Sequence, residues 1–229
     1  MIERDSPLAN PALEDIRGKI AKAAGIADRK PFDIALIAVS KTRSSDEIRP
    51  LLESGHRLFG ENRVQEAMDK WPALKAEYPD IELHMIGQLQ SNKAAEAVAL
   101  FDYIHSLDRP SLVKALAKEM ERQDRQIPCF LQVNIGEESQ KGGCEIKAVP
   151  DLLAQARSAG IEILGLMAVP PDNANPVPYF ALLAKLAREA GLAGLSMGMS
   201  GDFEKAVKLG STHIRVGTAL FGPRDAPAG

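Results

Sequence analysis

The segment IALIAVSKT, residues 34–42, begins as an apolar run of the length of a buried strand and ends abruptly in Ser40, Lys41 and Thr42. Seven further strand-like segments lie along the chain, and a polar or amphipathic stretch follows each one. Such a repeating order indicates a parallel sheet whose strands are joined through helices. The eight predicted strands cover residues 33–41, 57–61, 81–87, 103–107, 127–135, 162–169, 194–199 and 213–221.

Helical patterns lie between these strands. In SLVKALAKEM, residues 111–120, apolar side chains repeat at helical spacing, and YFALLAKLAREAG, residues 179–191, stops at a glycine. Eight strands alternating with helices predict a closed (β/α)₈ TIM barrel of the α/β class, with an extra N-terminal helix in PALEDIRGKIAKAAG, residues 11–25. An open doubly wound sheet is the structural alternative.

The composition predicts a single globular domain over residues 1–229. Of the 229 residues, 45% are hydrophobic, enough for a substantial core, and no linker-like composition interrupts the alternation. The proline-rich VPPDNANPVP, residues 169–178, is expected to be a loop after the sixth strand, and residues 224–229 a frayed tail.

Charge and cysteine usage narrow the classes of function. A formal net charge of −3 gives no electrostatic reason to expect a nucleic-acid partner. The first residues are charged where a secretory signal needs an apolar core, and no stretch has the length of a membrane span, so we expect a cytoplasmic protein without membrane contact. Cys129 and Cys144 form no CxxC pair, which indicates neither a zinc site nor a disulfide framework; Cys129 is expected in the core.

Lys41 is the first candidate functional residue. Functional groups of (β/α)₈ barrels cluster at the carboxyl ends of the strands, where Lys41 lies. Alternation places Ala35, Ile37, Val39 and Lys41 on one side of the first strand, at the top of the barrel lumen. A partly desolvated amine there is more readily neutral, and a neutral amine attacks a carbonyl carbon. The alternative is a lysine that caps the strand in solvent.

A candidate anion site follows the last two strands. LSMGMSGDFEKAVKLG, residues 195–210, passes from a strand through a Ser-Gly-Asp turn into a helix, which favours an anion at Ser200 and Gly201. After the eighth strand, Gly217 allows close approach of a ligand and Thr218 offers a hydroxyl. An ordinary helix start with a packing glycine is the alternative. A nucleophilic lysine beside a phosphate site predicts a phosphorylated aldehyde, either a sugar phosphate or pyridoxal phosphate.

Six motifs, in order, resemble the pyridoxal phosphate homeostasis protein family, which is similar in fold to the N-terminal barrel of alanine racemase. The resemblance runs from about residue 36 to 224. Its motifs are AVSKT (38–42), FGENRVQE (59–66), HMIGQLQSNK (84–93), GLMAVPP (165–171), LSMGMSGDFEKAVKLGST (195–212) and IRVGTALFG (214–222).

This resemblance implies a role for each candidate residue. Lys41 would form the internal aldimine with pyridoxal 5′-phosphate, while Ser200, Gly217 and Thr218 would hold the phosphate. Asn62 would line the cofactor, and Arg215 would face the pyridine nitrogen. A permanently charged arginine opposes protonation of that nitrogen, so the ring would be a weaker electron sink than one paired with a carboxylate.

The resemblance also implies a function. Members of this family are regarded as non-catalytic proteins that buffer and deliver pyridoxal phosphate and affect amino-acid and keto-acid balance. We therefore expect no catalytic residue, a monomer, and transient contact with apoenzymes that receive the cofactor. Alanine racemase needs a second, all-β domain with an opposing base, whereas this chain ends shortly after its eighth strand. A single-domain amino-acid racemase is the alternative, and a cofactor-free Schiff-base aldolase is a third possibility.

Several titratable residues are set aside. His84 lies in a matched motif but is as consistent with a structural histidine, and no histidine has the spacing of a metal ligand, so no metal site is expected. Lys141, in EESQKGG (residues 137–143), is expected in a solvated loop, with a secondary cofactor contact as the alternative.

Overall fold

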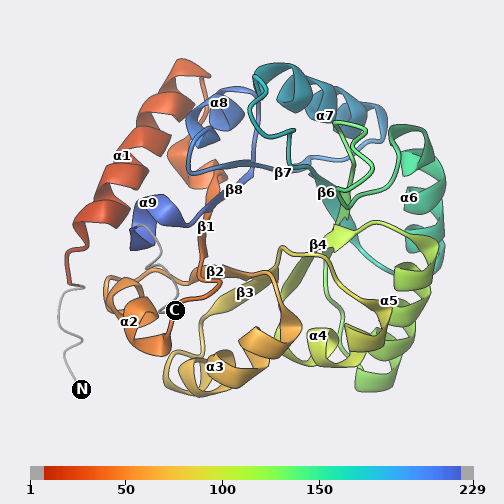
Figure 1. The fold of residues 1–229 in the computed structure, drawn as a ribbon, viewed down its shortest axis with the longest axis horizontal. Coiled ribbons are helices and arrows are strands. Elements are labelled where there is room, and N and C mark those ends of the chain that lie inside the picture. The colour runs from red at the N-terminus through yellow and green to blue at the C-terminus, as the bar shows by residue number, and fades with distance from the viewer. Residues whose placement is uncertain (1–7, 223–229) are drawn as a thin grey trace.

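A closed barrel of eight parallel strands forms the centre of the molecule, and helices surround it (Figure 1). The computed structural model describes residues 8–222. The predicted barrel is confirmed, and the open sheet was the wrong alternative because β8 pairs with β1. The strands are β1 Ala35–Val39, β2 Leu58–Glu61, β3 Glu82–Met85, β4 Tyr103–Leu107, β5 Cys129–Gln132, β6 Ile163–Met167, β7 Gly194–Met199 and β8 His213–Val216.

The extra N-terminal helix is also present, and it packs against the last two helices of the chain (Figure 1). No helix within residues 8–222 is long and apolar enough to cross a membrane. Residues 1–7 and the expected tail at 224–229 lie outside the described residues, so the single domain over 1–229 stays a prediction. The helices are α1 Pro11–Ile26, α2 Ser45–Glu53, α3 Val64–Glu77, α4 Ala94–Leu100, α5 Pro110–Gln123, α6 Val149–Ser158, α7 Val177–Glu189, α8 Phe203–Lys208 and α9 Thr218–Phe221.

Local sequence signals explain where the first helices begin. Asn10 precedes α1, and its side-chain oxygen accepts a hydrogen bond of 3.1 Å from the Leu13 amide. Ser44 precedes α2 and forms a reciprocal capping box with Glu47. Both arrangements satisfy amides that have no partner inside the helix.

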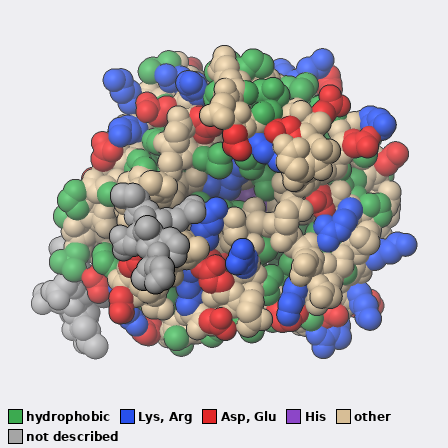
Figure 2. All heavy atoms as spheres, viewed as in Figure 1, with side chains coloured by type: hydrophobic (Ala, Val, Ile, Leu, Met, Phe, Trp, Pro, Cys, Tyr) green, Lys and Arg blue, Asp and Glu red, His purple; other side chains and the backbone are tan. Residues whose placement is uncertain are grey.

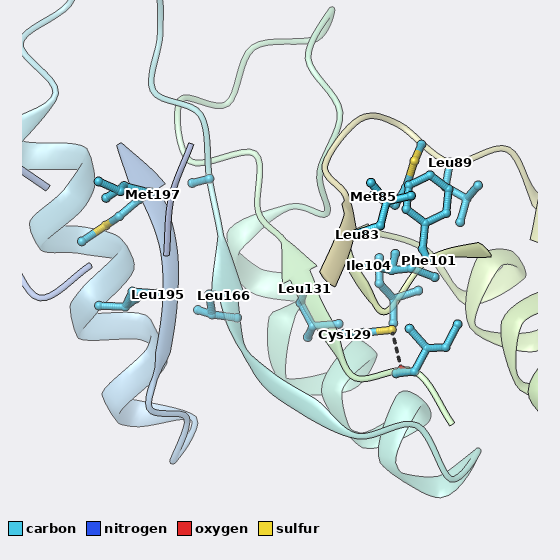
Figure 3. Packing of buried hydrophobic residues seen from close by; sticks show 14 of the residues in the cluster. Leu83, Met85, Leu89, Phe101, Ile104, Cys129, Leu131, Leu166, Leu195 and Met197 are labelled. Carbon is cyan, nitrogen blue, oxygen red and sulfur yellow. Dashed lines mark hydrogen bonds between the residues drawn. The ribbon is translucent and has the colours of Figure 1, made fainter. Parts of the chain in front are cut away.

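Most of the core lies between the barrel and the helices. Outward-facing side chains of the strands meet the apolar faces of the helices there, and Figure 3 shows part of this cluster around Leu131 and Cys129. The Cys129 thiol is fully buried and donates to the Ile127 carbonyl at 3.4 Å, which confirms it as a core residue.

The predicted first, third, fifth, sixth and eighth strands were too long, and the errors at the first and eighth bear on the site. Lys41 lies two residues beyond the end of β1, in a turn closed by a 3.1 Å hydrogen bond from the Arg43 amide to the Ser40 carbonyl. Residues 217–221 were predicted as strand, but the amides of Leu220 and Phe221 both donate to the Gly217 carbonyl, and Thr218–Phe221 forms α9. A short apolar stretch does not by itself distinguish a strand from one turn of helix.

Candidate functional site

A cavity of about 450 Å³ opens at the carboxyl ends of the strands. In the space-filling view it corresponds to the hollow at the centre of the face, where Lys and Arg side chains gather (Figure 2). All six residues to which the family resemblance gives a role line it, namely Lys41, Asn62, Ser200, Arg215, Gly217 and Thr218. The fold therefore brings together residues that are up to 177 positions apart in the chain.

Lys41 reaches this cavity from the turn after β1. Its side chain is half-buried, and Val39 lines the same cavity, so the alternation expected on this strand holds at its upper end. Thr42, the next residue, has a φ of 63°. This conformation is unfavourable for a β-branched residue and requires support from its surroundings. Lys41 is thus partly buried at the cavity wall rather than fully exposed.

The loops after β7 and β8 meet beside this lysine. The Gly217 amide donates to the Ser200 hydroxyl oxygen at 3.2 Å, which joins the two loops directly. The Asp202 carboxylate accepts from the Met199 amide at 2.6 Å and closes the turn after β7. Ser200 and Gly217 are half-buried while Thr218 is exposed, so the hydroxyls lie at the rim of the cavity.

Arg215 forms the floor of the cavity. The side chain is 4% exposed, and its guanidinium donates to the Ser196 hydroxyl at 2.6 Å and to the Ala168 carbonyl at 3.0 Å. Burial lowers the pKa of Arg215 to about 10, against an opposing effect of the Asp202 charge. The guanidinium therefore remains protonated at neutral pH, and as a donor-only group it presents N–H bonds and positive charge to a ligand.

A chain of buried hydrogen bonds continues from Arg215 into the barrel lumen. Ser196 Oγ lies 2.8 Å from His105 Nδ1, and His105 Nε2 lies 3.0 Å from His84 Nδ1. Burial lowers the pKa values of both histidines, so they are neutral. If Ser196 accepts from Arg215 and donates to His105, the Ser196 hydroxyl is satisfied in both roles, and His105 then donates to His84. His84 therefore belongs to this buried series of hydrogen bonds and does not line the cavity.

The third lumen histidine completes this layer. The ring centroids of His105 and His213 are 5.7 Å apart, and His213 Nδ1 lies 2.8 Å from Thr212 Oγ1. Despite this grouping, residues 8–222 contain no cluster of three or more potential ligands with metal-binding geometry.

Asn62 is placed by a close backbone contact. It follows β2, and a Cβ atom added to Gly87 would lie 2.2 Å from the Asn62 carbonyl oxygen and 2.6 Å from its Cα. A glycine at position 87 therefore allows the two loops to touch, and this contact holds Asn62 at the cavity wall.

Sequence reasoning missed one charged lining residue. Arg43 donates to Glu47 at 2.8 Å and to the Gly222 carbonyl at 2.7 Å, which ties the Lys41 turn to the end of α9. The only signal in the sequence for a lining role of Arg43 was its position two residues after Lys41. Gly201, expected at the anion site, and Val39, expected on the lumen side of the first strand, also line the cavity. The lining residues that were not predicted are Ile86, Val169 and Met199.

Lys141 is not the freely solvated side chain that was expected. Its ammonium donates to the Pro170 carbonyl at 3.0 Å and pairs with Glu138 at 3.0 Å, so it links the loops after β5 and β6. Only 23% of the side chain is exposed, and it is not among the residues that line the cavity.

Comparison with known proteins adds independent information. The sequence matches the family "Alanine racemase, N-terminal domain" over residues 13–225. A pyridoxal phosphate homeostasis protein of Pseudomonas aeruginosa is 38% identical over 226 residues, covering 94% of this chain and 96% of that protein. One from Escherichia coli K12 is 35% identical over 223 residues, covering 93% and 95%. The structure of PipY from Synechococcus elongatus PCC7942, solved with PLP bound, has a TM-score of 0.79 and 38% identity, and covers 89% of this chain and 100% of PipY.

Proposed function

Because the chain belongs to the pyridoxal phosphate homeostasis protein family, we propose that it binds pyridoxal 5′-phosphate in the cavity at the barrel mouth and holds it covalently on Lys41. The observation that carries this proposal is the convergence of Lys41, the Ser200–Gly217 loop pair and Arg215 on one cavity. The bound PLP of the PipY relative supports the same ligand.

The donor groups of the cavity fit this ligand. The lining side chains supply an amine, two hydroxyls and two guanidinium groups, and among the described lining residues there is no carboxylate. A phosphate needs such donors and is repelled by carboxylates. In this assignment Ser200, Gly217 and Thr218 hold the phosphate, while Arg215 donates toward the pyridine nitrogen.

Lys41 forms the covalent link. Its neutral amine adds to the aldehyde carbon, a C=N bond replaces the C=O bond, and the oxygen leaves as water with the two amine protons. Asn62 lines the ligand on the side of β2. When bound, pyridoxal phosphate supplies a conjugated ring that accepts electrons, but Arg215 keeps the ring nitrogen unprotonated and so weakens that property.

The proposed role is to buffer and deliver the cofactor rather than to catalyse a reaction. Racemisation requires proton transfer on both faces of the substrate, and the described residues that line the cavity include no His, Tyr, Cys, Asp or Glu. Thr218 is exposed at the rim, which suits exchange of the cofactor with other proteins. The proposal includes a cytoplasmic location, a monomeric state and transient contact with recipient apoenzymes.

Borohydride trapping tests this function directly. Purified protein is mixed with pyridoxal 5′-phosphate, its visible absorbance is recorded, and the adduct is reduced and mapped by peptide mass spectrometry. We expect a reduced adduct on Lys41 that is lost in Lys41→Ala and kept in Lys141→Ala, the control for the neighbouring loop lysine. An adduct mapped to Lys141, or none at all on the wild type, contradicts the proposal.

A second measurement separates the carrier from a racemase. The loaded protein is incubated with single enantiomers of amino acids, and the enantiomeric ratio is followed by chiral chromatography. We expect no sustained turnover. Turnover that disappears in Lys41→Ala overturns the carrier role.

A further inference from the structure

The turn that carries Lys41 is held by one largely buried side chain of α3, that of Lys70. Lys70 Nζ donates to the Ser40 carbonyl at 2.9 Å and to the Arg43 carbonyl at 3.1 Å. These two carbonyls flank Lys41 on either side. A single ammonium therefore spans the turn and fixes the backbone from which the Lys41 side chain leaves.

Two carboxylates complete this arrangement. Glu61, at the end of β2, lies 2.8 Å from Lys70 Nζ and also accepts from the Ser40 hydroxyl at 2.6 Å. Glu66, one turn before Lys70 on α3, lies 3.0 Å from Nζ and accepts from the Thr42 amide at 2.5 Å. Only 10% of the Lys70 side chain and none of the Glu61 side chain is exposed, so these charges interact with little screening by solvent.

This network of Lys70, Glu61 and Glu66 also supports Thr42, the strained residue of the turn. Thr42 has a φ of 63°, and the Glu66 carboxylate binds its amide in that conformation. Without such support a β-branched residue prefers negative φ, and the turn would sample other directions for Lys41.

We propose that Lys70 is a positioning residue that, together with Glu66, aims the Lys41 amine at the carbonyl carbon of its ligand. The proposal rests on the function proposed above. No described residue of α3 lines the cavity. In this proposal α3 nevertheless affects the rate at which Lys41 bonds to the ligand, while it does not affect recognition of the phosphate.

The test compares covalent and non-covalent binding in Lys70→Met. With pyridoxal 5′-phosphate we expect formation of the reducible Lys41 adduct to be about tenfold slower, since misdirection of a reacting group costs one to two orders of magnitude in rate. With pyridoxine 5′-phosphate, which has the ring and phosphate but no aldehyde, we expect affinity within about twofold of wild type. Lys70→Arg, which keeps the charge and the donors, should recover part of the rate.

Lys75→Met is the matched control. Lys75 lies on the same helix and likewise binds a carbonyl and a carboxylate, those of Leu100 and Asp102, but it does not contact the Lys41 turn. It should leave the adduct rate unchanged. If Lys70→Met does not fold, Glu66→Ala replaces it, with the same expected slowing.

The outcomes distinguish the two proposals. Adduct formation at the wild-type rate in Lys70→Met overturns the positioning role alone. A wild type without an adduct contradicts the proposed function, and amide hydrogen exchange then decides the positioning role: exchange at residues 41–43 should be faster in Lys70→Met than in Lys75→Met, and equal exchange refutes it. If analogue binding and adduct formation are lost to the same extent in Lys70→Met, the site as a whole is damaged, and the positioning role is also refuted.

Discussion

Replacing Gly87 by alanine should damage the site by moving Asn62. The added methyl carbon would lie 2.2 Å from the Asn62 carbonyl oxygen, about 1.2 Å closer than the 3.4 Å at which ordinary contact begins. All three nearest atoms belong to the Asn62 backbone, so no side-chain rotation relieves the clash. Overpacking of this kind costs about 1–3 kcal/mol, or roughly 2–12 °C in Tm for a chain of this size.

Cofactor binding should weaken as well. If Asn62 loses one hydrogen bond to the ligand, about 1 kcal/mol is lost, equivalent to about fivefold in Kd. Thermal unfolding and titration with pyridoxal 5′-phosphate measure the two effects. Gly18→Ala is the control, because Gly18 is exposed within α1 and a methyl group added there would have no atom within 4 Å, and it should gain about 0.5–1 kcal/mol. Wild-type stability and affinity in Gly87→Ala would refute the steric argument.

Two further predictions concern buried polar side chains. Ser196→Ala should lower the free energy of unfolding by about 1–3 kcal/mol, because it leaves buried polar atoms of Arg215 and His105 without a partner; a loss below about 0.5 kcal/mol in urea would contradict the hydrogen-bond chain. Burial lowers the pKa of His56 and of His213 to about 4, below the 6.5 of an unfolded histidine, so the unfolded chain binds these protons more readily. The stabilisation present above pH 6.5 should therefore be lost as the pH falls toward 4, and a urea midpoint that stays constant between pH 7.5 and 4.5 would disprove this linkage.

The fold was predictable because hydrophobic periodicity reports burial. The segment 34–39 is apolar since both of its faces are covered, whereas β3, β4, β7 and β8 carry polar side chains that face the lumen, such as His84, His105 and Arg215. The ends of β1 and β8 were not predictable in this way. They depend on the Ser40–Arg43 turn and on hydrogen bonds to the Gly217 carbonyl, which periodicity does not report.

The site was predictable to the extent that its residues lie in motifs. Lys41, Asn62 and Arg215 were found from the strand ends and the family resemblance, and the structure places them at one cavity. Lys70 was missed because its spacing of four residues from Glu66 is typical of many exposed helix pairs. Its significance arises only when α3 lies against the turn after β1, a tertiary contact with no local sequence signal.

The closure of β1 against β8 has a consequence for synthesis of the chain. Ala35 pairs with His213, and α1 packs against α8 and α9, so α1 and β1 leave the ribosome long before these partners are made. Until then β1 presents an unpaired edge to whatever is nearby, a condition that favours aggregation. Such non-local closure makes folding slow and largely post-translational. A nascent chain stalled before residue 203 would lack the closing strand β8 and also α8 and α9, the helices that pack against α1. Chaperones that bind exposed strand edges would act on that intermediate.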